Sequence, residues 1–303
     1  MVMISMDIVI VGHLSRDLIL TPETKREALG GGTAYAMLAP ALDAVATGIV
    51  SKVGDDFEEE YWNILKSSGL VLTGLKKVGT KSTRFVNKYD SEGNRVQMVE
   101  DLAGQITTRD FPEDYLDAKI IHFSPLTANE LDIDCIKLAR SNAKITSLDI
   151  QGYVRSVDNS GMVVPRVWAE RNEILSLVDV VKFNEVELKQ SVEGQSELST
   201  VSEILNLGPR IVLVTRDRRG STIYTRNEQI TIPLVSADVQ IDSTGCGDVY
   251  SIGFLLEYMR TSNLKRSGLF AATCSSFNVE TIGPYNFPSR LDVERRMKGY
   301  TEK

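Results

Sequence analysis

The clearest chemistry in this sequence lies in a short glycine-rich segment that leads into a helix. Residues 242–248 read Asp-Ser-Thr-Gly-Cys-Gly-Asp, and apolar residues recur at helical spacing over 249–259 directly after them. The first turn of a helix carries unpaired backbone N–H groups at the positive end of the helix dipole. Gly245 and Gly247 let the backbone approach a ligand closely and adopt positive φ angles. The segment therefore predicts an anion site made of backbone N–H groups.

Asp248 lies at the mouth of the same predicted helix, and its carboxylate has two interpretations. A negative charge in the first turn of a helix is stabilised by the helix dipole and needs no further role. Beside an anion-binding loop, however, that charge would repel the bound anion. A general base that takes a proton from a hydroxyl, which then attacks a phosphorus atom, explains this placement better.

Segment 242–248 resembles the C-terminal signature D-T-x-G-A-G-D of the ribokinase, or PfkB, carbohydrate kinases. Further segments agree with that family in order and spacing across nearly the whole chain: Val11–Gly12 with Asp17, Gly30–Ala34, Val53–Phe57, Asn184–Glu187 and Thr215–Gly220. Each short motif is weak alone, but the anion loop with its five partners in order is specific.

The resemblance implies a role for each matched residue. Asp248 would be the general base, while the backbone N–H groups of Gly245, Cys246 and Gly247 would stabilise charge on the phosphoryl oxygens. The other implied roles are substrate binding by Asp17, Gly31 and Gly32, water-mediated Mg²⁺ binding by Asn184 and Glu187, and nucleotide binding by Asn184, Thr215, Gly220 and Asn278.

Three positions depart from the family's usual residues. Tyr35 stands where many members have an Asn that contacts the sugar, and Asp217 replaces a Gly of the nucleotide loop. Cys246 replaces an Ala whose backbone N–H alone is used, so we expect a small packed side chain there. By position, Tyr35 is assigned to the acceptor site and Asp217 to the nucleotide site.

A fourth departure bears on the acceptor. Residues 149–155 read Asp-Ile-Gln-Gly-Tyr-Val-Arg instead of the common D-x-N-x-R pattern. Gln151 and Arg155 in this arrangement look more like the myo-inositol kinase subgroup and could read the hydroxyls of a polyol ring. A structural ion pair is the alternative explanation for Arg155.

The elements that must position these residues are visible as short β-branched runs. We expect strands at Asp7–Val11, Thr47–Val53, Lys119–Phe123, Lys144–Ile150, Val178–Phe183 and Arg210–Thr215. Most are continuously apolar, as in parallel strands covered on both faces, and helical patterns at 57–68 and 133–140 lie between them. This alternation indicates an α/β fold. The resemblance makes it ribokinase-like, a mainly parallel central sheet flanked by helices, with a small β lid.

Residues 82–100 break that alternation. Two strands, 82–89 and 95–100, are joined by the polar turn 90–94, which predicts a hairpin. An edge hairpin and a flap over a cleft fit the pattern equally, and the resemblance favours a lid with elements at about 15–29 and 80–103. We expect one domain over residues 1–303, and the family's habit of pairing lids allows a homodimer.

Composition limits the partners. The chain has 303 residues, 42% of them hydrophobic, and 34 Lys plus Arg against 41 Asp plus Glu give a net charge of −7. This balance argues against a nucleic-acid or anionic-membrane surface. The three cysteines are too few and too far apart for a disulfide framework or a zinc site, so we expect a cytoplasmic protein. Walker, dinucleotide, metalloprotease and serine-hydrolase motifs are missing.

The sequence therefore predicts a kinase that uses ATP and Mg²⁺ to phosphorylate a hydroxyl of a small sugar or polyol, myo-inositol-like by preference. A nucleoside or a phosphosugar is the alternative acceptor. A phosphosugar needs a further cationic site, for which Arg84, Lys88 and Arg155 are candidates. A different class of function, a sugar- or nucleotide-binding regulator without turnover, is the second hypothesis, and Asp217 is its main support.

Overall fold

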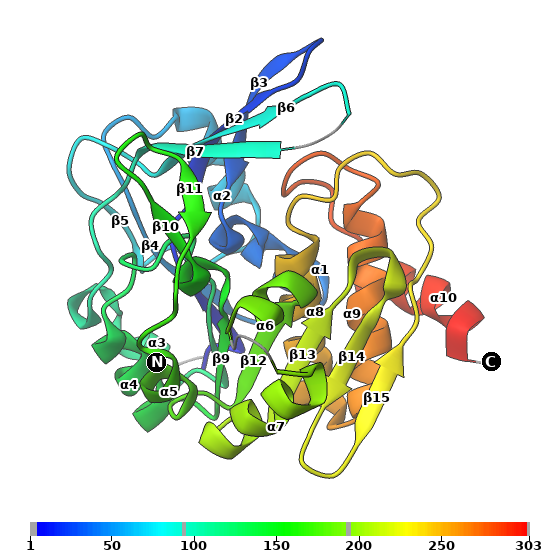
Figure 1. Cartoon of the computed structure of the whole chain (residues 1–303). Coiled ribbons are helices and arrows are strands. Elements are labelled where there is room, and N and C mark those ends of the chain that lie inside the picture. Colours follow the sequence, from blue (N-terminus) through cyan, green and yellow to red (C-terminus); the bar gives the residue numbers. More distant parts are fainter. Residues whose placement is uncertain (1–4, 93–94, 192–194, 302–303) are drawn as a thin grey trace.

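The computed structural model describes residues 5–92, 95–191 and 195–301. In these ranges a nine-stranded sheet runs through the molecule in the order β15-β14-β13-β12-β9-β8-β1-β4-β5 (Figure 1). Its strands are β1 Ile8–Val11, β4 Thr47–Val53, β5 Leu75–Lys77, β8 Ile120–Phe123, β9 Ile145–Asp149, β12 Val180–Asn184, β13 Ile211–Thr215, β14 Ser221–Tyr224 and β15 Gln229–Ile232. Neighbours from β5 to β13 are parallel, whereas β14 and β15 are antiparallel additions.

All six predicted strands are present. The strand at Thr47–Val53 has the predicted bounds, and the other five begin one or two residues later than expected. Their continuous apolarity has the predicted cause, because both faces of the sheet are covered. In β1, Ile8 and Ile10 belong to one core cluster, while Val9 and Val11 belong to the other.

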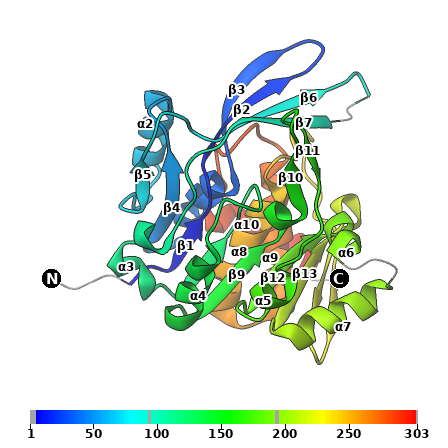
Figure 2. The same cartoon turned by 60° about the vertical axis from the view of Figure 1, so that its left-hand side comes forward.

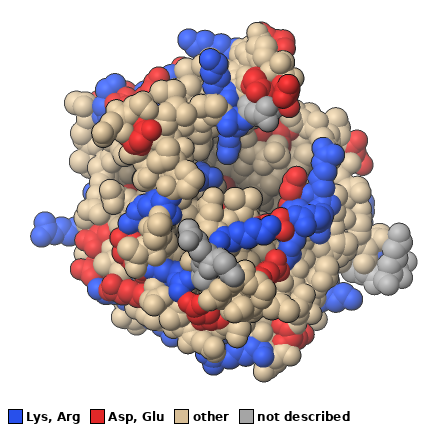
Figure 3. All heavy atoms as spheres, in the orientation of Figure 1, with Lys and Arg blue, Asp and Glu red and all other residues tan. Residues whose placement is uncertain are grey.

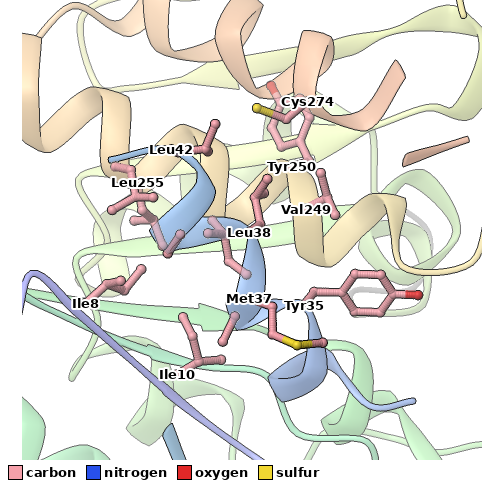
Figure 4. Close-up of a cluster of buried hydrophobic side chains, with 14 of the residues drawn as sticks. Ile8, Ile10, Tyr35, Met37, Leu38, Leu42, Val249, Tyr250, Leu255 and Cys274 are labelled. Carbon is pink, nitrogen blue, oxygen red and sulfur yellow. The ribbon is translucent and has the colours of Figure 1, made fainter. Parts of the chain in front are cut away.

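Ten α-helices of the described ranges form two layers around the sheet (Figures 1 and 2). One layer packs into the cluster of Ile8 and comprises α1 Leu38–Ala41, α2 Glu59–Ser67, α8 Cys246–Thr261, α9 Leu264–Asn278 and α10 Arg290–Thr301. The other packs into the cluster of Val9 and comprises α3 Glu113–Leu116, α4 Ile133–Asn142, α5 Arg171–Leu175, α6 Glu185–Ser191 and α7 Glu197–Leu207. Figure 4 shows how β1, α8 and residues 35–42 meet in the first cluster.

A four-stranded small sheet stands above the central sheet, in the order β3-β2-β6-β7 (Figures 1 and 2). It consists of β2 Ser15–Leu20, β3 Lys25–Gly30, β6 Arg84–Tyr89 and β7 Arg95–Asp101. The predicted hairpin over 82–100 is therefore confirmed as β6 and β7, which are antiparallel. Two residues of its predicted turn, 93 and 94, lie outside the described residues. A further two-stranded pair, β10 Arg155–Val157 and β11 Val163–Pro165, lies beside it.

The topology brings the chemically interesting residues to one edge of the central sheet. Val11, Asp149, Asn184 and Thr215 each end a parallel strand at its carboxyl end, and the small sheet overhangs this edge. Carboxyl ends of parallel strands are where open α/β sheets place their ligand sites. Within the described ranges, none of the helices has the length and apolarity needed to cross a bilayer.

Candidate active site

The predicted anion loop has the conformation that its glycines suggest. Helix α8 begins at Cys246, and the residue before it, Gly245, has a left-handed φ of 77°. The carbonyl of Thr244 accepts hydrogen bonds from the Tyr35 hydroxyl at 3.1 Å and from the Asn278 side-chain amide at 2.9 Å. Asp242 accepts from the backbone N–H of Thr244 at 2.9 Å. The loop is thus fixed from both sides. The Cys246 N–H donates a 3.3 Å hydrogen bond to the Ser243 carbonyl, whereas the N–H groups of Gly245 and Gly247 have no such partner among the described residues and are left for a ligand.

The contacts of Tyr35 account for a tyrosine at this position, where many family members have an Asn. Its ring packs directly under the loop, since a Cβ atom on Gly245 would lie 1.8 Å from the Tyr35 Cζ atom. Burial raises the pKa of its hydroxyl well above the usual value, which keeps the hydroxyl protonated as a donor. Tyr35 therefore supports the anion loop as well as lining the cavity beside it.

Asp248, in the first turn of α8, is held against Gly32. Its Oδ1 accepts a hydrogen bond of 2.8 Å from the Ser124 hydroxyl, and a Cβ atom on Gly32 would come within 2.4 Å of the same oxygen. Burial raises the pKa of Asp248 to about 6, and the nearby charge of Asp149 raises it while that of Lys182 lowers it. A carboxylate with this pKa is ionised at neutral pH yet basic enough to accept a proton.

Behind the anion loop lies an ion pair that sequence reasoning missed. Lys182 Nζ is 2.8 Å from Asp149 Oδ2, and only 6% and 4% of these side chains are exposed. A Cβ atom on Gly247 would lie 2.6 Å from Lys182 Nζ, so the ammonium group sits directly against the loop. Burial disfavours the charged lysine, but Asp149 and Glu187 outweigh it and raise the pKa of Lys182 overall. A fixed positive charge therefore stands beside the predicted anion site.

Asn184 and Glu187 are joined as the N-x-x-E spacing suggests. The backbone N–H of Asn184 donates to Glu187 Oε2 at 2.7 Å, and the backbone N–H of Glu187 donates to Asn184 Oδ1 at 2.8 Å. The second carboxylate oxygen, Oε1, is buried and without a hydrogen-bond partner among the described residues. Burial raises the pKa of Glu187 as well. An unpaired buried carboxylate oxygen fits a hydrated cation that arrives with a ligand.

A cavity of about 390 Å³ separates the small sheet from the carboxyl edge of the central sheet. Figure 3 shows a hollow in this region with Lys and Arg side chains on its rim. The cavity is lined by all the residues predicted to bind substrate: Asp17, Gly31, Gly32, Tyr35, Gln151 and Arg155. Asp248 of α8 lines it as well. Burial raises the pKa of Asp17 to about 6. The small sheet adds polar residues that we did not predict: Ser15, Asn87, Tyr89, Arg95 and Gln97.

A second cavity of about 430 Å³ lies on the opposite side of the anion loop. Thr215, Asp217 and Gly220 of the predicted nucleotide site line it, with Cys246. Asp217 has a left-handed φ of 49°, so it keeps the backbone conformation that a Gly would adopt. Ser243 lines both cavities. Segment 242–248 therefore forms the wall between them.

A sequence profile of the pfkB family carbohydrate kinases matches residues 5–290. The chain belongs to this family. Two curated relatives are 29% identical to it: a cytidine kinase of Thermococcus kodakarensis over 265 residues, 84% of this chain and 89% of that protein, and a nucleoside kinase of Methanothermobacter thermautotrophicus over 313 residues, 96% and 95% of the two.

The fold is similar to that of a solved pyrophosphate-dependent kinase of the ribokinase family, with a TM-score of 0.81 and 22% sequence identity. That kinase was solved in complex with a pyrophosphate analog and myo-inositol. The match covers 95% of this chain and 99% of that one. The predicted ribokinase-like fold is confirmed. This kinase is a phosphotransferase with an alcohol group as acceptor, of the sugar and nucleoside kinase class, so the non-catalytic regulator is set aside.

Some predicted residues of this kinase lie elsewhere than expected. Asn278 does not line the second cavity, because its amide points to the Thr244 carbonyl, and Asn184 lines the first cavity instead. Of the three cations considered for a phosphosugar, Arg84 is held outside the cavity by Glu27 and Glu100, and Lys88 does not line it. Charge pairing on the outer face of β6 accounts for Arg84.

Proposed function

We propose that this kinase transfers the γ-phosphoryl group of ATP to a hydroxyl of a nucleoside or a ring polyol, with Asp248 as general base. One observation carries the proposal: segment 242–248 forms a wall between two cavities, with Asp248 in the first and Cys246 in the second. A donor on one side and an acceptor on the other would meet at the first turn of α8. Its backbone N–H groups would stabilise the charge that develops on the phosphoryl oxygens.

The second cavity supports a nucleotide as donor instead of pyrophosphate. Beyond the anion loop its walls include Leu234, Val235, Ala272 and Val279, apolar side chains suited to a planar base. Pyrophosphate would leave this space unused.

Glu187 and Asn184 would hold Mg²⁺ through its water shell beside the donor phosphates. The cation would supply charge neutralisation at the phosphates. Lys182, fixed by Asp149, would add a positive charge from the protein.

The acceptor cavity is lined by both polar and apolar side chains. Asp17 and Gln151 can hydrogen-bond ring hydroxyls, whereas Phe85 and Leu126 offer a surface for a planar group. This division supports a nucleoside, the acceptor named for both curated relatives, whose sugar would meet Asp248. A myo-inositol-like polyol is the second candidate, since further polar side chains, Asn87, Gln97 and Arg155, line the same cavity.

A donor and acceptor matrix tests the proposal. ADP release should be measured with ATP, GTP and pyrophosphate as donors against cytidine, inosine, ribose, fructose and myo-inositol. We expect acceptor-dependent release of ADP from ATP with cytidine or inosine, and no transfer from pyrophosphate. Equal transfer from pyrophosphate would contradict the donor assignment, and ligand-induced melting shifts without turnover on any acceptor would contradict the whole proposal.

The rate should also depend on pH in a direction fixed by Asp248. The base works only when ionised, and burial raises its pKa to about 6. We therefore expect kcat/KM to fall as the pH drops below about 6 and to be level above it. Burial also raises the pKa of Asp17 to about 6, so two ionisations would make the acid side of the wild-type profile steeper than one would. In an Asp17→Asn variant the acid side should follow a single ionisation, that of Asp248. A profile that stays level down to pH 5 would contradict the assignment.

A further inference from the structure

Two arginines from different parts of the fold line the acceptor cavity. Arg155 follows the short 3₁₀ helix Gln151–Val154 and belongs to the wall formed by the body of the protein. Arg95 is the first residue of β7 and reaches the cavity from the small sheet. The two guanidinium groups thus come from separate parts of the chain, one of which overhangs the other.

Neither guanidinium makes a hydrogen bond or an ion pair within the described residues. The other arginines near the acceptor cavity behave differently. Arg84 pairs with Glu27 and Glu100, and Arg26 pairs with Asp242 at 3.2 Å. A structural ion pair, the alternative that the sequence left open for Arg155, is therefore not seen.

The surroundings of Arg155 make its positively charged form energetically unfavourable without a partner. Burial lowers the pKa of Arg155 and the charge of Arg95 lowers it further, while the charges of three carboxylates oppose these effects without a direct contact: Glu187, Asp149 and Asp248. Arg155 is partly buried and Arg95 is exposed, and their two like charges influence one another across the cavity. Buried cations normally have a counter-charge, and a planar guanidinium is suited to bidentate contact with the oxygens of a phosphate.

We propose that Arg95 and Arg155 together bind one phosphate-type oxyanion in the acceptor cavity, an inference that rests on the proposed kinase function. The oxyanion has two sources with the same chemistry. It is either a phosphate carried by the acceptor or the phosphoryl group of the donor as it is passed to the acceptor. Arg155 supplies the contact from the body, and Arg95 completes it from the small sheet.

Binding measurements with matched ligand pairs distinguish the two sources. In Arg155→Met and Arg95→Met, affinity should be measured by calorimetry for ADP and for AMP-PNP, and for fructose and for fructose 6-phosphate. Loss of charge-assisted hydrogen bonds should weaken one ligand of a pair by about 10- to 100-fold and leave the other unchanged. Selective loss of AMP-PNP identifies the donor phosphoryl group, and selective loss of fructose 6-phosphate identifies an acceptor phosphate.

Arg84→Met is the matched control, because Arg84 lies on the neighbouring strand and outside the cavity. Arg84→Met should change neither the affinity for AMP-PNP relative to ADP nor that for fructose 6-phosphate relative to fructose. The proposal is overturned if either Arg155→Met or Arg95→Met leaves both affinity ratios unchanged, AMP-PNP to ADP and fructose 6-phosphate to fructose, or if Arg84→Met changes them equally. Should Arg155→Met fail to fold, Arg155→Lys keeps the charge without the bidentate contact and should show an intermediate loss. None of these measurements needs turnover, so a wild-type protein that phosphorylates no acceptor would defeat the proposed function alone.

Discussion

Asp248→Asn is expected to lower kcat by about 10²- to 10⁴-fold, the usual cost of removing a general base. The asparagine side chain keeps the size of the aspartate and can still accept the hydrogen bond from Ser124, so the substitution removes the negative charge and the ability to take a proton. The fold should not suffer. Because the pKa of Asp248 in the folded protein is raised to about 6, its ionised form destabilises the fold at neutral pH. The melting temperature of the variant should therefore equal or exceed that of the wild type.

Asp134→Asn provides the matched control for this substitution. Asp134 also lies in the first turn of a helix, α4, but its side chain is exposed and pairs only with Lys137 at 3.2 Å. The same chemical change there should leave kcat within a factor of two or so, because a surface ion pair contributes roughly 0–1 kcal/mol to stability and nothing to transfer. Equal activity losses in both variants would mean that Asp248 acts through the helix dipole and not as a base.

Gly245→Ala is expected to cost both stability and activity. A left-handed φ of 77° is strained for alanine, and the alanine Cβ would overlap the Tyr35 ring, 1.8 Å from its Cζ atom. Relieving that overlap must move the ring or the anion loop, at a cost of about 1–3 kcal/mol beyond the backbone strain. Displaced N–H donors of an oxyanion site typically reduce kcat by about 10²- to 10³-fold. Chemical denaturation and steady-state kinetics measure the two effects.

Gly79→Ala separates the overlap from the backbone strain. Gly79 has almost the same φ, 78°, but a Cβ atom there would meet nothing within 4 Å. This variant should lose only the strain energy, about 1–2 kcal/mol, and keep its kcat. If Gly245→Ala is no worse than Gly79→Ala in stability and activity, the packing of Tyr35 under the loop does not position the site.

Local patterns in the sequence were sufficient for much of this fold. Apolar runs predicted six strands of the central sheet, because each is covered on both faces and its burial shows in its own residues. The anion loop was predictable for a similar reason, since the positive φ of Gly245 and the helix after it are properties of neighbouring residues. The supporting role of Tyr35 was not visible, because it depends on contact with a loop about 210 residues further along the chain.

The same limit explains the residues that were missed around Asp248. Ser124 follows β8, Asp149 ends β9, and Lys182 lies within β12, so only the order of strands in the sheet brings them together. Each looked like an ordinary residue of an apolar run or the loop after it. A signal was nevertheless available, because polar side chains at the carboxyl ends of predicted parallel strands converge on one edge. Arg95 carried no such signal, since its position depends on how the small sheet leans over that edge.

The most direct test of Asp248 as the base between two cavities is a single-turnover measurement of phosphoryl transfer, with ATP and the best acceptor both bound to excess enzyme. Under these conditions neither substrate binding nor product release limits the observed rate. We predict that Asp248→Asn binds both substrates with affinities close to those of the wild type and transfers the phosphoryl group about 10²- to 10⁴-fold more slowly. Transfer at the wild-type rate by this variant would contradict the account.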